Sequence, residues 1–164
     1  MSEAANEIVF RPMVKEDIPY IIAIEQEAFT SPWSEEAFHN ELNNNMFARY
    51  YVMEGNGELL GYGGMWIIMD EAHITNIAIR ADARGKGLGN RLLEQLQHKA
   101  LHFGAAKMTL EVRASNTIAQ SLYLKYGFEP SGIRPRYYSD NEEDALIMWA
   151  ELNVGSQKTG ENRN

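Results

Sequence analysis

Apolar residues follow helical and strand spacing in turn along this chain, which predicts one alternating α/β unit. Residues 17–29 carry isoleucines near helical spacing, and the polar and proline-containing segment 30–34 ends that pattern. Ser34 is a good capping residue, so a second helix is expected to begin there and to end at residues 43–45. A third and longer helix, residues 90–102, places leucines on one face.

Strand-like runs surround these helices. Three consecutive runs are joined by a Gly55-Asn56-Gly57 turn and by Asp70-Glu71, which is typical of antiparallel hairpins. The expected strands of this group are residues 47–53, 59–69 and 72–79. The other expected elements are a first strand at residues 8–11, a strand at 107–112, a helix at 117–126 ended by Gly127, and strands near 128–138 and 145–152.

The pattern contains no internal repeat, and 164 residues suit one domain that can bury its core without metals or disulfides. We assign residues 1–152 to this domain. Residues 153–164 are polar and poor in apolar side chains, which predicts a disordered tail.

Composition narrows the possible classes of protein. The chain has no cysteine, which excludes a disulfide framework, a thiolate metal site and a cysteine nucleophile. The first residues lack an apolar core, and no apolar run approaches transmembrane length, so a cytoplasmic protein without a membrane partner is expected. The net charge of −8 disfavours nucleic acid and favours neutral or basic partners. We expect a monomer or a weak dimer.

A glycine-rich segment, Arg84-Gly85-Lys86-Gly87-Leu88-Gly89, lies between an expected strand and the third helix. Its glycines allow a phosphate to approach the backbone, and the following helix directs free N–H groups and its positive dipole end at that place. Asn90 stands where a dinucleotide fingerprint needs glycine, and the Gly-Lys-Ser/Thr of a P-loop is absent. An anion site is therefore predicted, with a plain strand-to-helix turn as the alternative.

Two motifs carry a resemblance to a known family. Arg84, Gly87 and Gly89 fit the pattern R/Q-x-x-G-x-G/A, which resembles the pyrophosphate loop of the GNAT acetyltransferases. The later pattern E-V-R-x-x-N-x-x-A-x-x-L-Y-x-x-x-G-F, which runs from Glu111 to Phe128, resembles the second half of the same fold. Trp33 and the segment from Arg136 to Ala145 are most similar to its protein N-terminal branch, closest to the RimI-type ribosomal-protein-alanine acetyltransferases.

The resemblance implies a GNAT fold, an α/β (α+β) class with a mixed, mostly antiparallel six- to seven-stranded sheet and about four helices. It also implies acetyl-CoA as co-substrate. The backbone of the strand before the loop would contact the pantetheine arm, the loop and helix start would contact the pyrophosphate, and two later residues would complete the site. The implied contacts are Ile77, Ala78, Ile79, Arg84, Gly85, Lys86, Gly87, Leu88, Gly89, Asn90, Asn116 and Tyr123. Asn116 could equally be a helix N-cap, and Lys86 could be solvated.

The acid–base chemistry of acetyl transfer selects two residues. A protein α-amine is roughly a tenth neutral at pH 7, whereas a lysine is neutral on the order of one part in two thousand, so the α-amine is the easier acceptor. Glu111, at a strand end, is the candidate base, directly or through water, and Tyr123 is the candidate acid for the leaving thiolate. The alternatives are a salt bridge from Glu111 to Arg113 or a neighbour, and a merely packed Tyr123. The resemblance assigns the same two catalytic roles.

Acceptor choice is less constrained. The resemblance implies acceptor contacts from Trp33, Tyr137 and Tyr138, and an acidic group around the first two helices could line the peptide side or simply be a solvated face: Glu25, Glu27, Glu35 and Glu36. We expect the α-amine of a small-subunit ribosomal protein beginning with alanine. A lysine or small-amine acetyltransferase and a non-catalytic acyl-CoA-binding module are the alternatives. The four histidines lack metal-site spacing, so no metal is expected.

Overall fold

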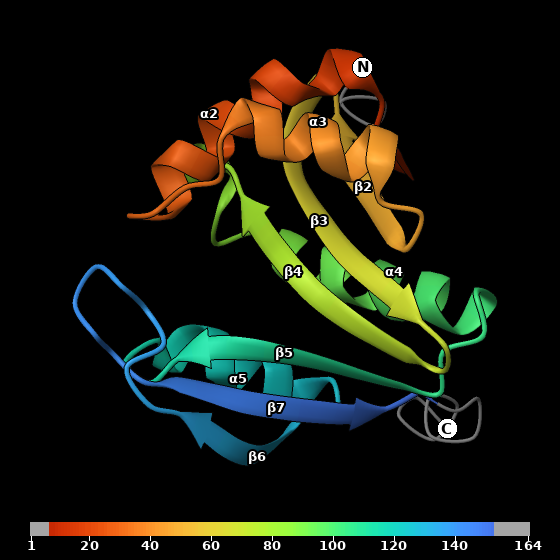
Figure 1. The fold of residues 1–164 in the computed structure, drawn as a ribbon. Coiled ribbons are helices and arrows are strands. Elements are labelled where there is room, and N and C mark those ends of the chain that lie inside the picture. Colours follow the sequence, from red (N-terminus) through yellow and green to blue (C-terminus); the bar gives the residue numbers. More distant parts are fainter. Residues whose placement is uncertain (1–6, 153–164) are drawn as a thin grey trace. The chain divides into compact units, whose positions relative to one another are not determined.

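The computed structural model describes residues 7–152, and the expected polar tail lies outside them. Figure 1 shows the order of the elements along the chain. The helical elements are η1 (Lys15–Asp17), α2 (Ile18–Ala28), α3 (Glu35–Asn44), η2 (Ala81–Ala83), α4 (Leu88–His102) and α5 (Thr117–Lys125). The strands are β1 (Ile8–Pro12), β2 (Ala48–Gly55), β3 (Glu58–Ile68), β4 (Glu71–Ile79), β5 (Lys107–Arg113), β6 (Glu129–Arg134) and β7 (Ala145–Glu151).

Every long helix and strand expected from the sequence is present, and most boundaries agree within one residue. β2 continues to Gly55, two residues further than expected, and two other boundaries differ for clear reasons. The helix α4 begins at Leu88 rather than Asn90, because the end of the glycine segment already has helical geometry. The strand β6 ends at Arg134 instead of continuing to residue 138. Pro135 follows and has no N–H for a ladder, and Arg136 has a left-handed φ of 50°, so the chain leaves the strand there.

The seven strands form one sheet in the order β1-β2-β3-β4-β5-β7-β6, which confirms the mixed, mostly antiparallel sheet. β4 and β5 are parallel and in register over Glu71–His73, whereas β1 with β2, β2 with β3, β5 with β7, and β7 with β6 are antiparallel. The chain divides into two compact units. The first contains the residues up to Trp66 and Thr75–Gln95; the second contains Ile67–Ile74 and the residues from Leu96.

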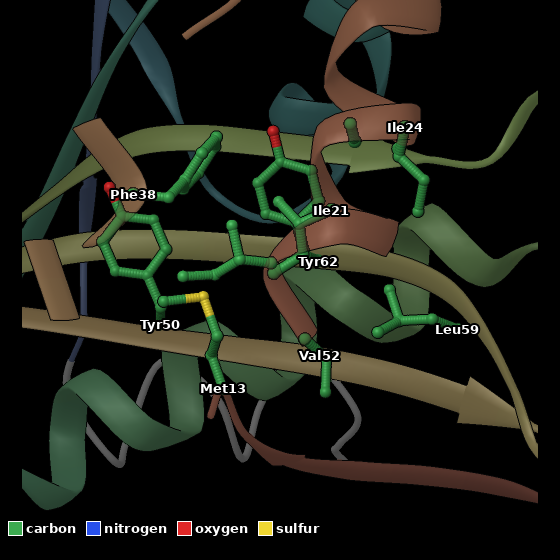
Figure 2. Packing of buried hydrophobic residues seen from close by; sticks show 10 residues of the cluster. Met13, Ile21, Ile24, Phe38, Tyr50, Val52, Leu59 and Tyr62 are labelled. Carbon is green, nitrogen blue, oxygen red and sulfur yellow. The ribbon is translucent and has the colours of Figure 1, made fainter. Parts of the chain in front are cut away.

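In the first unit the strands are covered on both faces. Figure 2 shows the core between the sheet and the helices α2 and α3, where Ile21 and Phe38 pack against Tyr50, Val52 and Tyr62 of the strands. The opposite side chains of the strands form a second cluster with α4, which contains Met53, Leu88 and Leu92 together with Ile77 and Ile79. The alternation of side chains along the strands produces this two-sided burial.

The fit of Tyr50 depends on a glycine across the strand pair. Tyr50 on β2 lies opposite Gly64 on β3. A Cβ at residue 64 would lie 2.0 Å from the Tyr50 ring, so this position has room only for glycine. The Tyr50 ring lies close to the β3 backbone at Gly64, and its hydroxyl reaches Glu41, Thr75 and Asn76.

A carboxylate is buried in the same layer. Glu25 of α2 is 2% exposed, and it accepts hydrogen bonds from the Tyr62 hydroxyl, from the Trp33 backbone N–H at 2.9 Å and from the Asn76 side chain. Burial raises the pKa of the Glu25 carboxyl above its ordinary value, against the opposing effect of the N–H donors.

The second unit is built on the β5-β7-β6 ladder and α5. The Asn116 side chain caps α5 by accepting the Ala119 N–H at 3.1 Å, as one of its two expected roles required. Gly127, with a φ of 91°, ends the helical region, and Phe128 then packs on Tyr123 with a ring distance of 5.7 Å. The Gln97 side chain donates to the Tyr126 carbonyl and ties the end of α5 to α4.

Replacing Glu25 by glutamine should change how stability depends on pH. Because the pKa of Glu25 is raised in the folded state, the native protein binds this proton more tightly than the unfolded chain does. The contribution of Glu25 is therefore fully present below the ordinary carboxyl pKa and is lost as the pH rises through the raised value. The unfolding free energy of the wild type minus that of Glu25→Gln should fall over this interval, measured by urea denaturation at several pH values. Glu16→Gln, which removes an exposed carboxylate of η1, is the matched control, and a difference independent of pH would contradict the expectation.

Candidate active site

The glycine segment connects η2 to α4 in the first unit. Gly85 and Gly87 have φ values of 78° and 80°, in the left-handed region that glycine adopts without strain. Nothing lies within 4 Å of the place where either Cβ would be, so the loop backbone is open on that side. The Gly87 carbonyl accepts the first helical bond of α4, from the Arg91 N–H. The N–H groups just before it have no partner within the helix and are available to an anion.

Contacts outside the loop hold it in place. The Arg84 Nε donates to the Ile79 carbonyl at 3.0 Å, so this side chain folds back onto the end of β4. The Ala81 N–H donates to Glu27 Oε1 at 2.8 Å, which ties η2 to α2. Lys86 is exposed, in keeping with the solvated alternative, and Leu88 is buried in the core, which leaves its backbone N–H as the group a ligand could reach.

The side chains of the β4 end also belong to the core. Ile77 and Ile79 pack on the α4 side, and Ala78 lies in the cluster below α2 and α3. Because the side chains on both faces of the strand are buried, we expect a ligand to contact only the backbone groups of these residues.

One polar atom near the loop is unmatched. Asn90 Oδ1 is buried and has no hydrogen-bond partner among residues 7–152. Buried acceptors in native proteins are nearly always paired, so an external N–H or O–H donor is the natural partner for the first turn of α4. The open glycine backbone offers donors and Asn90 offers an acceptor, which suits a ligand with both a phosphate and an amide.

Trp33 lies between α2 and α3 in the first unit. Its ring is partly buried against Phe38 and Tyr50, at ring distances of 5.3 Å and 6.5 Å, and its backbone N–H donates to Glu25. One of the four glutamates expected to form an acidic group on this side does not lie on the surface. Glu25 points into the core, because three donors inside it bind the carboxylate, whereas Glu27, Glu35 and Glu36 are exposed.

In the second unit, Glu111 lies on β5 with its side chain 27% exposed. Its Oε2 accepts Arg134 Nε of β6 at 3.1 Å. The ion pair thus exists, but with Arg134 rather than Arg113. Sequence reasoning missed Arg134, since its approach depends on the β5-β7-β6 register, in which both Glu111 and Gly132 lie opposite Ile147.

Three tyrosines accompany Glu111. Tyr123 of α5 is 7% exposed, and burial, with Tyr138 nearby, raises the pKa of its phenol to about 12. The Tyr137 and Tyr138 rings meet edge to face at 5.1 Å, and the charge of Glu111 contributes to the raised pKa of both. Burial is the larger cause in each case. The structure therefore gathers Glu111, Tyr123, Tyr137 and Tyr138 in one unit.

The segment between β6 and β7, which carries Tyr137 and Tyr138, is fastened to the end of β5. Arg113 pairs with Asp140 at 3.0 Å and Glu143 at 3.3 Å, and its guanidinium lies 4.0 Å from the centre of the Tyr138 ring. Glu143 also accepts the Ser115 N–H at 2.6 Å, directly before Asn116. Residues 135–138 of this segment were expected to be strand; instead, side-chain contacts determine the conformation of the segment.

Comparison with known proteins identifies the family. Residues 18–128 match the acetyltransferase (GNAT) family. The chain belongs to the GNAT acetyltransferase family. It is 40% identical over 136 residues to the ribosomal protein bS18-alanine N-acetyltransferase of Escherichia coli K12, covering 80% of this chain and 89% of the relative.

A further relative and a solved structure support the assignment. A Bacillus subtilis protein, provisionally described as having the same activity, is 49% identical over 143 residues, covering 87% of this chain and 95% of the relative. The crystal structure of the ribosomal-protein-S18-alanine N-acetyltransferase from Escherichia coli superposes with a TM-score of 0.83 at 34% identity, covering 96% of this chain and 99% of that one. The protein is thus an acetyltransferase of the GNAT fold that uses acetyl-CoA, and the loop and Asn90 fit that co-substrate.

Within the described part of the chain, no group of three or more acidic, histidine or cysteine residues could hold a metal ion. No helix among the described residues is long and apolar enough to cross a membrane.

A charge in the first turn of α4 should weaken acetyl-CoA binding. In Gly89→Asp the carboxylate would repel the pyrophosphate, while an acidic residue near a helix N-terminus should not harm folding. We expect the Kd for acetyl-CoA to rise at least about tenfold, measured by calorimetry. Gly89→Asn, of similar size without the charge, should have a much smaller effect, and equal Kd values for the two variants would contradict an anion site.

Proposed function

We propose that this protein transfers acetyl from acetyl-CoA to the N-terminal α-amine of a protein, namely the N-terminal alanine of a small-subunit ribosomal protein. The relatives named above support the acceptor class, since each is described as acting on an alanine of protein bS18. The observation that carries the chemistry is the cluster of Glu111 with a buried Tyr123 and two further tyrosines in one unit.

The acceptor must lose a proton before it can react. An α-amine has a pKa of about 7.8, so an appreciable fraction is already the free base near neutral pH, and only modest help is needed. Glu111 is proposed as this base, directly or through a water molecule, because it is a partly exposed carboxylate beside Tyr137 and Tyr138. The ion pair with Arg134 occupies Oε2, and the proposal assigns the proton to the other carboxylate oxygen, Oε1.

Tyr123 is proposed to act on the sulfur. When bound, the thioester supplies an acetyl carbonyl carbon to which the neutral amine nitrogen adds, and the carbon–sulfur bond then breaks. An ordinary phenol has a pKa near 10, whereas burial raises the pKa of Tyr123 to about 12. Full transfer to a thiolate whose conjugate pKa is about 8.5 would be uphill, so the main effect of the Tyr123 hydroxyl is a hydrogen bond to the developing charge. The acceptor nitrogen loses two protons in all: the ammonium loses one before attack, which is released, and the nitrogen loses a second after it adds, which balances the proton that the thiolate takes up to leave as the thiol.

The two substrates use different residues in this proposal. The N–H groups of Gly85 to Asn90 bind the pyrophosphate, with Arg84 at the loop entrance. The backbone of Ile77 to Ile79 and the free side-chain nitrogen of Asn116 contact the rest of the co-substrate. Trp33, Tyr137 and Tyr138 contact the acceptor peptide, and the exposed glutamates near α2 and α3 attract a basic one.

Loss of either catalytic group should lower turnover. Glu111→Gln and Tyr123→Phe should each reduce kcat by roughly 10²–10⁴, the usual effect of removing a positioned acid, base or hydrogen-bond donor, with little change in the Kd for acetyl-CoA. Both are measured by steady-state kinetics and calorimetry. Tyr20→Phe, which removes an exposed hydroxyl from α2, is the control. Wild-type turnover in both catalytic variants would refute the assigned roles.

The acceptor assignment can be tested with four matched peptides. All four derive from the same ribosomal-protein N-terminal sequence. The first begins with alanine, the second has a bulky first residue, the third has a blocked α-amine and an internal lysine, and the fourth has its basic residues made neutral. We expect the alanine peptide to react fastest and its rate of acetylation to fall as salt is added. Fragment mass spectrometry measures which amine carries the acetyl group. Acetylation of the blocked peptide as fast as the free one would instead favour a lysine acetyltransferase.

A further inference from the structure

The mechanism above leaves one buried ionisable group without a role, the carboxylate of Glu25. No ion pair joins it to a Lys, Arg or His side chain in the described part of the chain. Its hydrogen-bond donors come from three different places: Tyr62 on β3, Asn76 on β4, and the backbone of Trp33 in the segment between α2 and α3. All of these residues belong to the first unit.

Burying a carboxylate in a core costs more free energy than burying an apolar side chain. Transfer of a charged group out of water costs free energy that hydrogen bonds only partly return, and apolar residues of similar volume often stabilise a protein as well or better. A leucine or methionine in α2 would complete the apolar layer around Ile21 and Ile24. The reason for a carboxylate at this position must therefore lie in the groups whose hydrogen bonds it accepts.

The Trp33 N–H shows what would be lost. The segment between α2 and α3 has no regular secondary structure, so no helix or strand ladder binds this N–H. Glu25 accepts it at 2.9 Å, and the Trp33 ring then packs on Phe38 and Tyr50. The position of the Trp33 ring therefore depends on the Glu25 carboxylate of α2, rather than on hydrogen bonds within the segment that carries Trp33.

The same carboxylate is connected to the strands. Asn76 binds Glu25 and also accepts from the Tyr50 hydroxyl at 3.2 Å, and Tyr50 in turn meets Glu41 of α3 at 3.1 Å. The Trp66 indole donates to Glu41 at 2.6 Å. These polar contacts run from α2 across β4 and β2 to α3. Figure 2 shows the rings of Phe38, Tyr50 and Tyr62, which are buried in the same layer.

We propose that Glu25 is a positioning residue for the acceptor: its carboxylate fixes the Trp33 segment to β3 and β4, so that the acceptor peptide meets Trp33 in one orientation. The proposal rests on the proposed function, in which Trp33 contacts the peptide. Glu25 acts through Trp33 and touches neither substrate.

A double-mutant cycle tests this coupling. Glu25→Gln keeps the size of the side chain but offers one carbonyl oxygen to three donors. It should raise the KM for the alanine peptide about tenfold, with kcat changed less than about threefold and the Kd for acetyl-CoA unchanged. Trp33→Ala keeps the backbone N–H and removes the ring. If Glu25 acts through this ring, the double variant should bind the peptide no worse than Trp33→Ala alone.

Two further variants keep the test decisive. Tyr62→Phe removes one hydrogen-bond donor to Glu25 and leaves the bond from the Trp33 backbone N–H intact, so it should raise the KM about threefold. This variant replaces Glu25→Gln in the test if Glu25→Gln does not fold. Glu16→Gln, an exposed carboxylate of η1, should behave as the wild type. Additive effects of Glu25→Gln and Trp33→Ala on KM, or a loss confined to kcat, would overturn the proposal.

Amide hydrogen exchange separates this proposal from the acceptor assignment. Exchange of the Trp33 N–H should be at least about tenfold faster in Glu25→Gln than in the wild type, whatever the acceptor. If the wild type fails to acetylate the alanine peptide, the proposed function is wrong. Unchanged exchange at Trp33 would show that Glu25 does not hold the segment, even if the acceptor assignment is correct.

Discussion

The first unit depends on strands that are buried on both faces. Side chains on one face of β2, β3 and β4 pack under α2 and α3, and those on the other face pack on α4. A polar group that enters these buried layers needs a hydrogen-bond partner. This explains why the hydroxyls of Tyr50 and Tyr62 and the carboxylates of Glu25 and Glu41 occur together. It also makes the exception at Asn90 informative, since the unpaired atom lies at the first turn of α4.

The second unit places its functional groups in another way. Tyr137 and Tyr138 lie in an irregular segment, and the Arg113 guanidinium fastens it through Asp140, Glu143 and the face of the Tyr138 ring. The end of β5 therefore contributes two neighbouring side chains with different tasks. Glu111 faces Arg134 and the two tyrosines, and Arg113 holds the segment that carries them. A loss of Arg113 would disturb the acceptor side without removing any proposed acid or base.

The elements could be predicted from the sequence because their periodicity is strong and their boundaries carry specific signals. Ser34 caps α3, Asn116 caps α5, and Gly85 and Gly87 adopt the conformation that suggested a ligand loop. Local pattern could not predict contacts that depend on strand register or on distant side chains. Arg134 and Glu111 are brought together by strands that both pair with β7, and the raised pKa of Tyr123 follows from its burial, with a further contribution from Tyr138 nearby. The direction of Glu25 was missed because an amphipathic helix is expected to turn glutamate to solvent, and here three internal donors outweighed that preference.

Gly64 shows how a residue without a side chain can direct chemistry beyond its own contacts. The Tyr50 ring occupies the space where a Cβ would be, and from there its hydroxyl joins Glu41 to Asn76 and, through Asn76, to Glu25. Any larger residue at this position would lift the ring and break the connection in its middle, although each of the other groups would remain in the sequence. If Glu25 positions the acceptor through Trp33 as proposed, a relative could keep Glu25, Asn76 and Trp33 and still hold its acceptor differently when it differed only at the residue opposite Tyr50. Under that proposal, the identity of residue 64 would mark an acceptor geometry that a comparison of catalytic residues alone would overlook.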